Sequence, residues 1–468
     1  MKAIIIGAGK LGTKLAESML HSDIEVTLVD DSVGVIDRLN DHLDLLTVHG
    51  NGLDIGMLQE IDIKSYDLLI ATTDSDESNA LICTLAKKLH CKKTIARIRN
   101  PQYMQHLEFI KEELGIDHIV SPELSTANEI RRYLLKNFNF YSGNFAEGKV
   151  QLVDILIPPQ GEFIGQKIMD IKGLSNILIV AIHRNQRIII PDGSTVIEEQ
   201  DVIYVLGKSH DITEFTSRCK LNLQKVSVKR AMILGGGRIG YYLAKQLSKA
   251  HIEVSIIESD RERSKYLAEN LKDVMVIHGD GTQVNLLDEE GLKNVDAFIS
   301  VTGMDEQNLL MSLVAKRAGV PKTIAKISRP SFINLTNQLG NDVSISPVTI
   351  AASEILKYVR SGRVVSISLI LGGQAEVTEV MVGENLPVVG VKISEIGLPK
   401  GIIIGTIVHK DQVIIPDGQT VIHANDRLII FSLESNLPNL DIFLKAIKVG
   451  KMEHIGKKNQ GIRKLLNS

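Results

Sequence analysis

The chain has 468 residues, of which 44% are hydrophobic and 23% charged, the balance of a globular protein with about three domains. Lys and Arg (53) are nearly balanced by Asp and Glu (56) and only 4% of residues are aromatic, which argues against nucleic-acid binding and against a base- or sugar-stacking surface. Three cysteines are too few for a disulfide framework or a four-cysteine metal site, and no apolar run approaches the roughly 18 residues that cross a bilayer, so we expect a cytoplasmic chain.

The sequence repeats itself once along its length. AIIIGAGKLG (3–12) returns as AMILGGGRIG (231–240), and IIPDGSTVI (189–197) returns as IIPDGQTVI (414–422). Because the second occurrence follows nearly half a chain length after the first, we predict two large units in tandem, here called copy 1 and copy 2, rather than a solenoid of short repeats.

Short apolar runs alternate with helical patterns in the first part of each copy. In copy 1 the runs are AIII (3–6), VTLV (26–29), LLTV (45–48), LLIA (68–71), TIARI (94–98) and HIVS (118–121). They are apolar throughout, as expected for strands covered on both faces. Leu11, Leu15 and Met19 between the first two runs lie at helical spacing on one face. The pattern predicts an α/β fold in which residues 1–140 and 226–361 each form a Rossmann-like, doubly wound parallel sheet.

A glycine-rich segment, GAGKLG in copy 1, follows the first apolar run and opens a helical pattern. Gly7 permits a tight turn, Gly9 lets the backbone approach a pyrophosphate, and Gly12 lets helix and strand pack closely. The N–H groups at the start of the helix then face the phosphate oxygens. The corresponding glycines of copy 2 are Gly235, Gly237 and Gly240. Two such segments in one chain indicate nucleotide binding rather than glycines that serve only a turn.

The second apolar run of each copy ends in an acidic residue. Asp30 follows Gly12, and Glu258 follows Gly240, by about 18 residues, close to the spacing of a ribose-binding acid in dinucleotide folds. A carboxylate there accepts hydrogen bonds from the ribose hydroxyls and repels a 2′-phosphate. The pattern therefore favours NAD(H) or adenine nucleotides over NADP.

Polar residues follow the third and fourth apolar runs, at the same edge of the predicted sheet. Asn51 or Asp280 could hydrogen-bond an adenine, although Asn-Gly and Asp-Gly also form plain turns. Thr72 and Thr73 could meet the ribose or phosphate, while the Asp and Ser residues that follow them are expected to cap the next helix.

Basic residues lie at the end of the fifth run. Arg97 and Arg99 are two residues apart and therefore share one face of a strand. Two guanidiniums in this place suit a polyphosphate, and a structural ion pair is the alternative. Copy 2 has Lys326 and Ser328 at these positions, so we expect a less positive and weaker phosphate site there.

The second part of each copy contains short strands with turn signals, which predicts a small α+β module in residues 141–225 and again in residues 362–448. His183 and His409 recur in these modules, each in a charged turn that resembles a solvated hairpin. No Ser-His-Asp set, carboxylate pair or metal-ligand spacing is apparent. We therefore expect no catalytic residues, no metal site and no enzyme activity. The basic residues of 449–468 are expected to form a solvated tail.

Together these motifs resemble the regulator-of-potassium-conductance (RCK) domain family, in which a nucleotide-binding half precedes a C-terminal half. The doubled arrangement over about residues 1–448, with NFAEGKV (144–150) between the halves, is similar to the regulatory subunits of Trk potassium uptake systems. The resemblance implies a non-enzymatic, peripheral protein on the inner face of the cell membrane. It also implies binding of NAD(H), with ATP or ADP as further ligands, and a ring of subunits, a homotetramer or a dimer, that gates a separate membrane potassium translocator.

The resemblance also assigns ligand positions, including the first residues of the helix after each glycine turn. In copy 1 they are Gly7, Gly9, Lys10, Leu11, Gly12, Asp30, Asn51, Thr72, Thr73 and Arg97. In copy 2 they are Gly235, Gly237, Arg238, Ile239, Gly240, Glu258, Asp280, Thr302 and Lys326. Asn51 and Ser328 depart from the residues usual in the family, so the ligand of each half stays open. A soluble NAD-dependent oxidoreductase is the alternative function.

Overall fold

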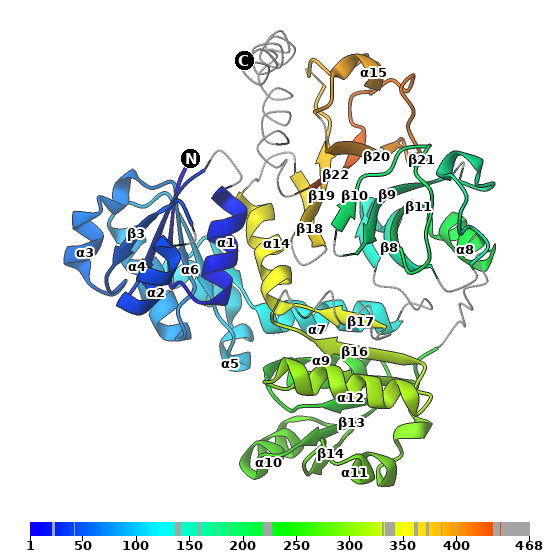
Figure 1. Ribbon diagram of the computed structural model, residues 1–468. Helices are drawn as coiled ribbons and strands as arrows, with labels where there is room; N and C mark the ends of the chain where they lie inside the picture. The colour runs from blue at the N-terminus through cyan, green and yellow to red at the C-terminus, as the bar shows by residue number, and fades with distance from the viewer. Residues whose placement is uncertain are drawn as a thin grey trace. The chain divides into compact units, whose positions relative to one another are not determined.

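The computed structural model describes residues 1–20, 24–41, 43–135, 142–157, 161–174, 176–185, 187–218, 227–329, 332, 342–359, 364–370, 374–384, 386–399, 401–433 and 440 (Figure 1). The predicted domain boundaries at 140/141, 225/226, 361/362 and 448/449, and the tail 449–468, lie outside these residues, and the boundaries stay predictions. By its contacts the chain divides into two compact units, Met1–Asn139 with Gln224–Leu356 and Phe140–Leu223 with Lys357–Ser468.

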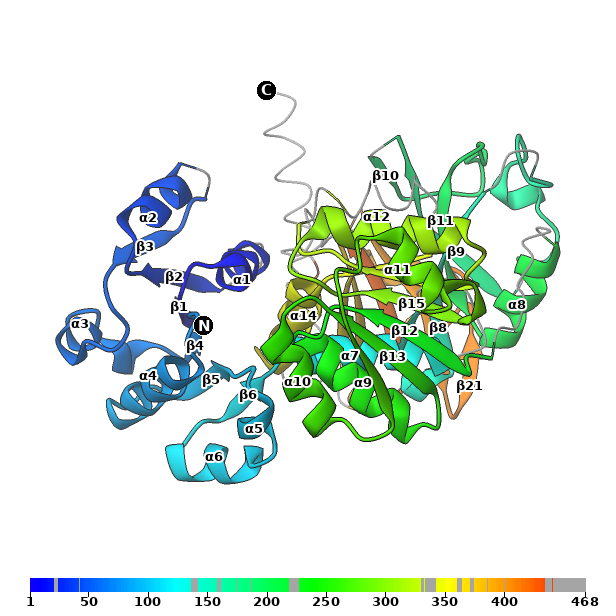
Figure 2. The same ribbon diagram turned by 90° about the horizontal axis from the view of Figure 1, so that it is seen from below.

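The N-terminal part of copy 1 is a six-stranded parallel sheet between two layers of helices. Its strands are β1 (Lys2–Ile6), β2 (Glu25–Asp30), β3 (Leu46–His49), β4 (Leu68–Ala71), β5 (Lys93–Arg97) and β6 (His118–Val120). Its helices are α1 (Lys10–Leu20), α2 (Val33–Asn40), α3 (Ile55–Glu60), α4 (Asp76–Lys88), α5 (Pro101–Met104), α6 (Leu107–Leu114) and α7 (Pro122–Leu135). The strand order β3-β2-β1-β4-β5-β6 is that of the doubly wound dinucleotide folds. Figure 2 shows α1 and α2 on one face of the sheet and α4 and α6 on the other.

The corresponding part of copy 2 has the same topology, β14-β13-β12-β15-β16-β17. Its strands are β12 (Arg230–Leu234), β13 (Glu253–Glu258), β14 (Val274–His278), β15 (Ala297–Ser300), β16 (Lys322–Lys326) and β17 (Val343–Ile345). Its helices are α9 (Arg238–Lys249), α10 (Arg261–Asn270), α11 (Val284–Glu289), α12 (Asp305–Arg317) and α14 (Pro347–Val359).

Burial explains why these segments form strands and helices. Strands β1 and β4 are buried on both faces over almost their whole length, as their uninterrupted apolar sequences predict. Leu11, Leu15 and Met19 of α1 are all buried, so the helical face that the sequence predicts is the one that packs on the sheet. The predicted Rossmann-like class is confirmed for both copies.

Each C-terminal module is a five-stranded, largely antiparallel sheet, as the α+β prediction requires. The first contains β7 (Ser142–Phe145), β8 (Val150–Leu156), β9 (Ile177–Arg184), β10 (Arg187–Ile189), β11 (Val202–Gly207) and helix α8 (Ser209–Arg218). The second contains β18 (Val364–Ile370), β19 (Ala375–Met381), α15 (Ile393–Ile396), β20 (Ile402–His409), β21 (Gln412–Ile414) and β22 (Arg427–Leu433). Their strand orders, β10-β9-β11-β8-β7 and β21-β20-β22-β19-β18, are equivalent.

The two modules share one hydrophobic core. Val180 and Leu206 of copy 1 belong to the same buried cluster as Val377 and Phe431 of copy 2. The duplicated modules therefore pack on each other within one unit. Among the described residues, no helix is both long and apolar enough to span a bilayer.

Candidate nucleotide site

The glycine-rich turn between β1 and α1 is held tightly against the end of β4. Gly7 has φ +101°, a left-handed conformation that glycine adopts without strain, and a Cβ there would lie 2.8 Å from the carbonyl carbon of Thr72. A Cβ at Gly12 would overlap the carbonyl oxygen of Gly7. Gly9, in contrast, has nothing within 4 Å of such an atom. The turn and the close helix–strand packing are thus as predicted, and Gly9 borders open space.

Copy 2 has the same turn between β12 and α9. Gly235 has φ +106°, and a Cβ at Gly240 would overlap the carbonyl oxygen of Gly235. Gly237 has nothing within 4 Å of an added Cβ. The two copies therefore present the same backbone arrangement at the ends of their first strands.

The acidic residues at the ends of β2 and β13 are bound to the glycine turns. The amide of Ala8 donates to Asp30 Oδ2 (2.7 Å), and the amide of Ser32 donates to Asp30 Oδ1 (3.0 Å). In copy 2 the amide of Gly236 donates to Glu258 Oε2 (2.7 Å). Each carboxylate oxygen has two lone pairs, so these bonds leave acceptor capacity for ribose hydroxyls. Each acid therefore fixes the glycine turn through a hydrogen bond and still has lone pairs that can accept further hydrogen bonds.

Asn51 and Asp280 form turns after β3 and β14. The amide of Leu53 donates to Asn51 Oδ1 (2.9 Å), and the amide and hydroxyl of Thr282 donate to Asp280 Oδ1 (3.0 and 2.8 Å). This is the turn chemistry that the sequence left as an alternative. Both side chains are exposed, and their contact with adenine stays a prediction.

Thr72 and Thr73 are engaged within the protein. Thr72 is buried, and its hydroxyl donates to the carbonyl oxygen of Gly7 (2.8 Å), which ties β4 to the glycine turn. The hydroxyl of Thr73 donates to Asn79 Oδ1 (2.7 Å). The predicted cap of the following helix is formed by Ser75, whose hydroxyl accepts from the amide of Ser78 (3.1 Å).

Asn79 organises this edge of the sheet, and sequence reasoning gave it no role. It is fully buried in α4, its Oδ1 accepts from the amide of Thr73 (2.8 Å), and its Nδ2 donates to the carbonyl oxygens of Thr73 (3.1 Å) and Arg97 (2.9 Å). One side chain thereby fixes the ends of β4 and β5. The recurrence of DESN (76–79) as DEQN (305–308) was the signal that could have found it.

Asn308 does the same in copy 2. Its Oδ1 accepts from the amide (2.8 Å) and hydroxyl (2.8 Å) of Thr302, and its Nδ2 donates to the carbonyl oxygen of Lys326 (3.0 Å). The predicted ligand positions Thr302 and Lys326 are therefore held beside each other by a buried amide.

The two arginines of copy 1 have different surroundings. Arg99 Nε donates to Asp76 Oδ1 (3.1 Å), and the Arg99 amide donates to Asp76 Oδ2 (2.8 Å), so the structural ion-pair interpretation is the correct one for this residue. Arg97 Nη2 forms an ion pair with Oδ1 of the exposed Asp74 (3.5 Å). The Nε of Arg97 is buried and has no hydrogen-bond partner among the described residues. Burial and the neighbouring Arg99 lower the pKa of Arg97 below its ordinary value. Arg97 is thus a partly desolvated cation with unused hydrogen-bonding capacity.

In copy 2 the corresponding ion pair shifts by one residue. Ser328 contributes only its amide to Asp305 (3.0 Å), and the guanidinium of Arg329 takes the place of Arg99, with Nε 3.4 Å from Asp305. Lys326 donates to the carbonyl oxygen of Thr302 (2.7 Å), and burial lowers its pKa.

Arg263 adds a positive charge to copy 2 that sequence reasoning missed. Its Nε donates to the carbonyl oxygen of Gly236 (2.7 Å), so the guanidinium lies beside the glycine turn. The corresponding residue of copy 1 is Val35. The expectation of a less positive site in copy 2 considered only the end of the fifth strand and omitted this group.

The Rossmann-like domains contact each other through α7 of copy 1 and α9 of copy 2. The hydroxyl of Tyr242 donates to the carbonyl oxygen of Arg99 (3.2 Å). Glu123 of α7 interacts electrostatically with Arg97, Arg99 and Arg238, and burial raises its pKa. Arg238 begins the helix after the glycine turn of copy 2. A charged group of copy 2 therefore interacts electrostatically with Glu123 of copy 1, which also interacts with Arg97 and Arg99.

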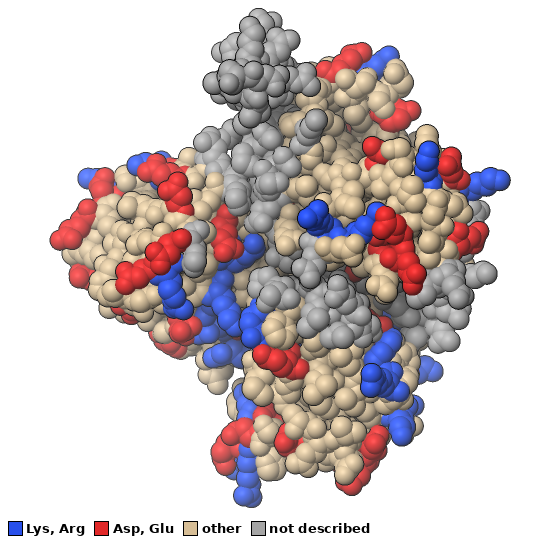
Figure 3. All heavy atoms as spheres, viewed as in Figure 1, with Lys and Arg blue, Asp and Glu red and all other residues tan. Residues whose placement is uncertain are grey.

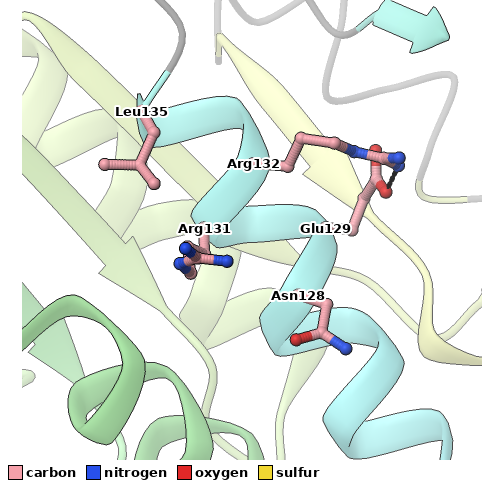
Figure 4. A pocket seen from close by; sticks show the side chains of 5 residues that line it. All are labelled: Asn128, Glu129, Arg131, Arg132 and Leu135. Atoms are coloured by element: carbon pink, nitrogen blue, oxygen red, sulfur yellow. Dashed lines mark ion pairs between the residues drawn. The ribbon is translucent and has the colours of Figure 1, made fainter. Parts of the chain in front are cut away.

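A surface hollow on α7 is lined by residues other than the predicted nucleotide ligands. Asn128, Glu129, Arg131, Arg132 and Leu135 line it, and Figure 4 shows the ion pair between Arg132 and Glu129 with Arg131 on another side of the helix. On the surface shown in Figure 3, each Rossmann-like domain carries both basic and acidic side chains.

The two histidines of the C-terminal modules are not equivalent. His183 is buried in β9, and burial lowers its pKa, so the expectation of a solvated residue is wrong for it. His409, at the end of β20, occupies the position that Arg184 has at the end of β9.

Comparison with known proteins agrees with this architecture. The TrkA-N domain model matches residues 3–122 and 231–347, and the TrkA-C domain model matches residues 152–220 and 377–441. The chain belongs to the TrkA family. Trk system potassium uptake protein TrkA homolog 2 of Methanosarcina mazei is 34% identical over 455 residues, which cover 95% of this chain and 100% of that protein. The TrkA protein of Haemophilus influenzae is 34% identical over 451 residues, covering 94% and 98%.

Solved structures share the fold of this TrkA family member. The GsuK RCK domain aligns with a TM-score of 0.55 and 19% identity, covering 96% of this chain and 95% of that chain. The GsuK channel bound to NAD aligns with a TM-score of 0.56 and 18% identity, covering 96% and 79%. GsuK bound to ADP aligns with a TM-score of 0.50 and 16% identity, covering 77% and 69%. The relatives and structures are named as uptake proteins, channels or RCK domains, and the prediction that this chain is not an enzyme agrees with these names.

Proposed function

We propose that this chain is the nucleotide-sensing regulatory subunit of a Trk-type potassium uptake system, which binds NAD(H) and adenine nucleotides and gates a membrane potassium translocator. The observation that carries the proposal is the pair of sheet edges at which a glycine turn, an acid bonded to that turn and a basic residue follow the carboxyl ends of parallel strands. Ligands of open α/β sheets bind at this edge, where the strand order reverses.

The proposed ligand positions in copy 1 are the turn from Gly7 to Gly12, Asp30, Asn51, Thr73 and Arg97. Asp30 would take the ribose hydroxyls, and the start of α1 would take the phosphates. The buried Arg97 Nε, which has no partner among the described residues, supplies a donor for a phosphate oxygen. Because the Thr72 hydroxyl is bonded to Gly7, we propose that it contributes by holding the turn.

In copy 2 the proposed positions are the turn from Gly235 to Gly240, Glu258, Asp280, Thr302 and Lys326. Glu258 corresponds to Asp30 and has the same bond to the glycine turn. NAD and ADP as ligands are supported by the fold shared with GsuK, which has been solved with each of them.

Gating requires that a ligand bind two conformations with different affinity. A crevice that closes fully on a dinucleotide and less fully on a shorter nucleotide provides such a difference, and a coupling of about 1–3 kcal/mol is typical of allosteric proteins. We propose that the contact between α7 and α9 transmits the difference between the copies, since it joins the end of β5 in copy 1 to the helix that follows the glycine turn of copy 2. The names of the relatives, which are potassium uptake proteins, support a potassium translocator as the partner. We propose that the chain binds it at the inner face of the cell membrane. A ring of two or four chains would present the paired domains to it.

The test is affinity purification of the tagged full chain from solubilised membranes of its own cell, with NADH, ATP, ADP or no nucleotide. We expect a membrane potassium translocator to be retained, in an amount that depends on the nucleotide. Absence of any potassium translocator under all four conditions would contradict the proposal. Sustained oxidation of NADH with a carbonyl substrate would favour the oxidoreductase alternative instead.

A further inference from the structure

Three side chains that can bind a metal ion meet in the second C-terminal module. His409 ends β20, and His423 and Asp426 lie in the segment that leads into β22. One ligand atom from each lies within 4.8 Å of the other two. Asp426 is buried, whereas the side chains of His409 and His423 are 28% and 57% exposed, so the group is open to solvent on one side.

The duplication supplies an internal comparison for this group. In copy 1 the corresponding positions are Arg184, Glu198 and Asp201. Arg184 donates to both oxygens of the buried Asp201 (2.7 Å each) and also pairs with Glu198. Copy 1 therefore joins the strand end to the turn with a guanidinium and two carboxylates, and copy 2 has two imidazoles and one carboxylate at the same places.

The turn itself is conserved between the two modules in geometry. The amide of Glu198 donates to Asp201 Oδ2 (2.8 Å), and the amide of His423 donates to Asp426 Oδ2 (2.7 Å). The buried aspartate thus has the same backbone role in both copies, and the difference is confined to the other two side chains.

The two imidazoles do not reproduce the bonds that Arg184 makes in copy 1. His409 Nδ1 lies at hydrogen-bond distance from Asp426 Oδ1 (2.6 Å), but His423 Nδ1 is 3.9 Å from Asp426 Oδ2, beyond a hydrogen bond. The centroids of the two rings lie 4.8 Å apart, and their planes are tilted by 51° to each other. Two ring nitrogens and a carboxylate oxygen converge, and at most one ring nitrogen is bonded to that carboxylate.

We propose that His409, His423 and Asp426 bind a divalent transition-metal ion, with zinc as the reference ion. Two imidazoles and one carboxylate form a common three-ligand zinc set, and the fourth position is left to water or to a group of another molecule. In a tetrahedral site with bonds of about 2.0–2.2 Å, neighbouring ligand atoms lie about 3.3 Å apart. The distance from His409 Nδ1 to Asp426 Oδ1 (2.6 Å) is shorter than this value, and the distance from His423 Nδ1 to Asp426 Oδ2 (3.9 Å) is longer. Because the three ligand atoms lie within 4.8 Å of one another, side-chain rotations would bring them to a common ion.

The metal would take over the structural role of Arg184. The ion would join the end of β20 to the segment before β22. The second module would therefore be more stable with the ion bound than without it. This inference does not depend on nucleotide binding, because the three residues belong to the C-terminal module and the proposed nucleotide ligands belong to the Rossmann-like domains.

The test is a zinc titration of the chelator-treated full chain by calorimetry, together with the absorption spectrum of the cobalt form. His409→Arg combined with His423→Glu gives copy 2 the residues that copy 1 already accommodates, so the fold is expected to remain. We expect this variant to bind one zinc ion fewer per chain, or to bind it at least about 10-fold more weakly, and to lose the tetrahedral cobalt spectrum. His210→Ala removes an exposed histidine elsewhere and is the matched control.

Two further variants keep the result decisive. His423→Ala, at the most exposed of the three positions, should weaken zinc binding even if the double variant does not fold. Arg184→His combined with Glu198→His should add one zinc site in copy 1. Equal zinc stoichiometry and affinity in the unmodified chain, the double variant and His423→Ala would overturn the proposal and leave a hydrogen-bonded His–Asp pair. If the reciprocal variant gained no zinc site, two histidines and the buried aspartate at these positions would not be a sufficient ligand set, which would contradict the proposal.

Discussion

The two Rossmann-like domains share their backbone-fixing residues and differ in their charged ones. Both have the left-handed first glycine, an acid bonded to the glycine turn, and a buried asparagine that joins the fourth and fifth strands. Beside these conserved elements, copy 1 has Arg97, whose Nε has no partner among the described residues, whereas copy 2 has Lys326 bonded to a carbonyl and Arg263 bonded to the glycine turn. Duplication has preserved the residues that fix the backbone at this edge of the sheet and changed the charged residues near it.

The largest expected effect is the loss of nucleotide binding at one proposed site at a time. Asp30→Asn with Arg97→Ala should weaken binding of NADH in copy 1 by about 3–6 kcal/mol, since each removes a charge-assisted hydrogen bond worth about 1.5–3 kcal/mol. Glu258→Gln with Lys326→Ala should do the same in copy 2. Calorimetry with the full chain measures both, and Asp31→Ala, an exposed neighbour of Asp30, is the control. Equal affinities in all variants would refute the site assignment.

The next effect concerns the shared scaffold. Asn79→Ala leaves the amide of Thr73 and the carbonyl oxygen of Arg97 without their buried partner, so we expect the unfolding free energy of the copy 1 domain to fall by about 2–4 kcal/mol. Urea denaturation measures it. Asn270→Ala removes one exposed hydrogen bond and should change little. If both variants were equally stable, the organising role of Asn79 would be wrong.

A smaller effect is expected for Lys322, the first residue of β16. Lys93 is the corresponding first residue of β5. Lys93 is exposed, but Lys322 is fully buried with its ammonium over the ring of Tyr133 (5.1 Å), and burial lowers its pKa from 10.5 to about 8. The unfolded chain then binds more protons than the folded chain between these values, so the free energy of unfolding rises with pH from about 8 to about 10. We expect Lys322→Met to remove about 1–2 kcal/mol of this rise. Lys93→Met is the control, and identical pH profiles for both would contradict the pKa shift.

The smallest effect is that of Arg263. Arg263→Val places the residue of copy 1 beside the glycine turn of copy 2 and removes one positive charge near the phosphates. Adenine-nucleotide affinity of copy 2 should fall by about 3- to 10-fold, and less at high salt, because screening weakens the interaction. Titrations at two ionic strengths test this. A loss that does not depend on salt would point to distortion of the turn instead.

Much of this architecture could be predicted because it depends on local patterns. Uninterrupted apolar runs gave the six strands of copy 1, and the spacing of Leu11, Leu15 and Met19 gave the buried face of α1. The glycine spacing predicted a turn whose left-handed first residue and close helix contact the structure contains.

Other features depend on contacts between distant segments and were not predicted. Asn79 acts through carbonyl groups of two strands, and Arg263 reaches a turn of the preceding βα unit, so neither role follows from sequence spacing. The recurrence of a histidine in the two modules was misleading. His409 ends β20 at the position that Arg184 has at the end of β9, whereas His183 is buried within β9. His423 and Asp426 come near His409 only through the antiparallel pairing of β20 with β22.

The most direct measurement is a structure of the full chain determined with NADH and, separately, with ADP. The account predicts ligand density in both crevices, with a ribose against the carboxylates of Asp30 and Glu258 and phosphates at the starts of α1 and α9. Ordered crevices that contain no ligand at saturating concentration, or ligand bound only elsewhere on the chain, would contradict it.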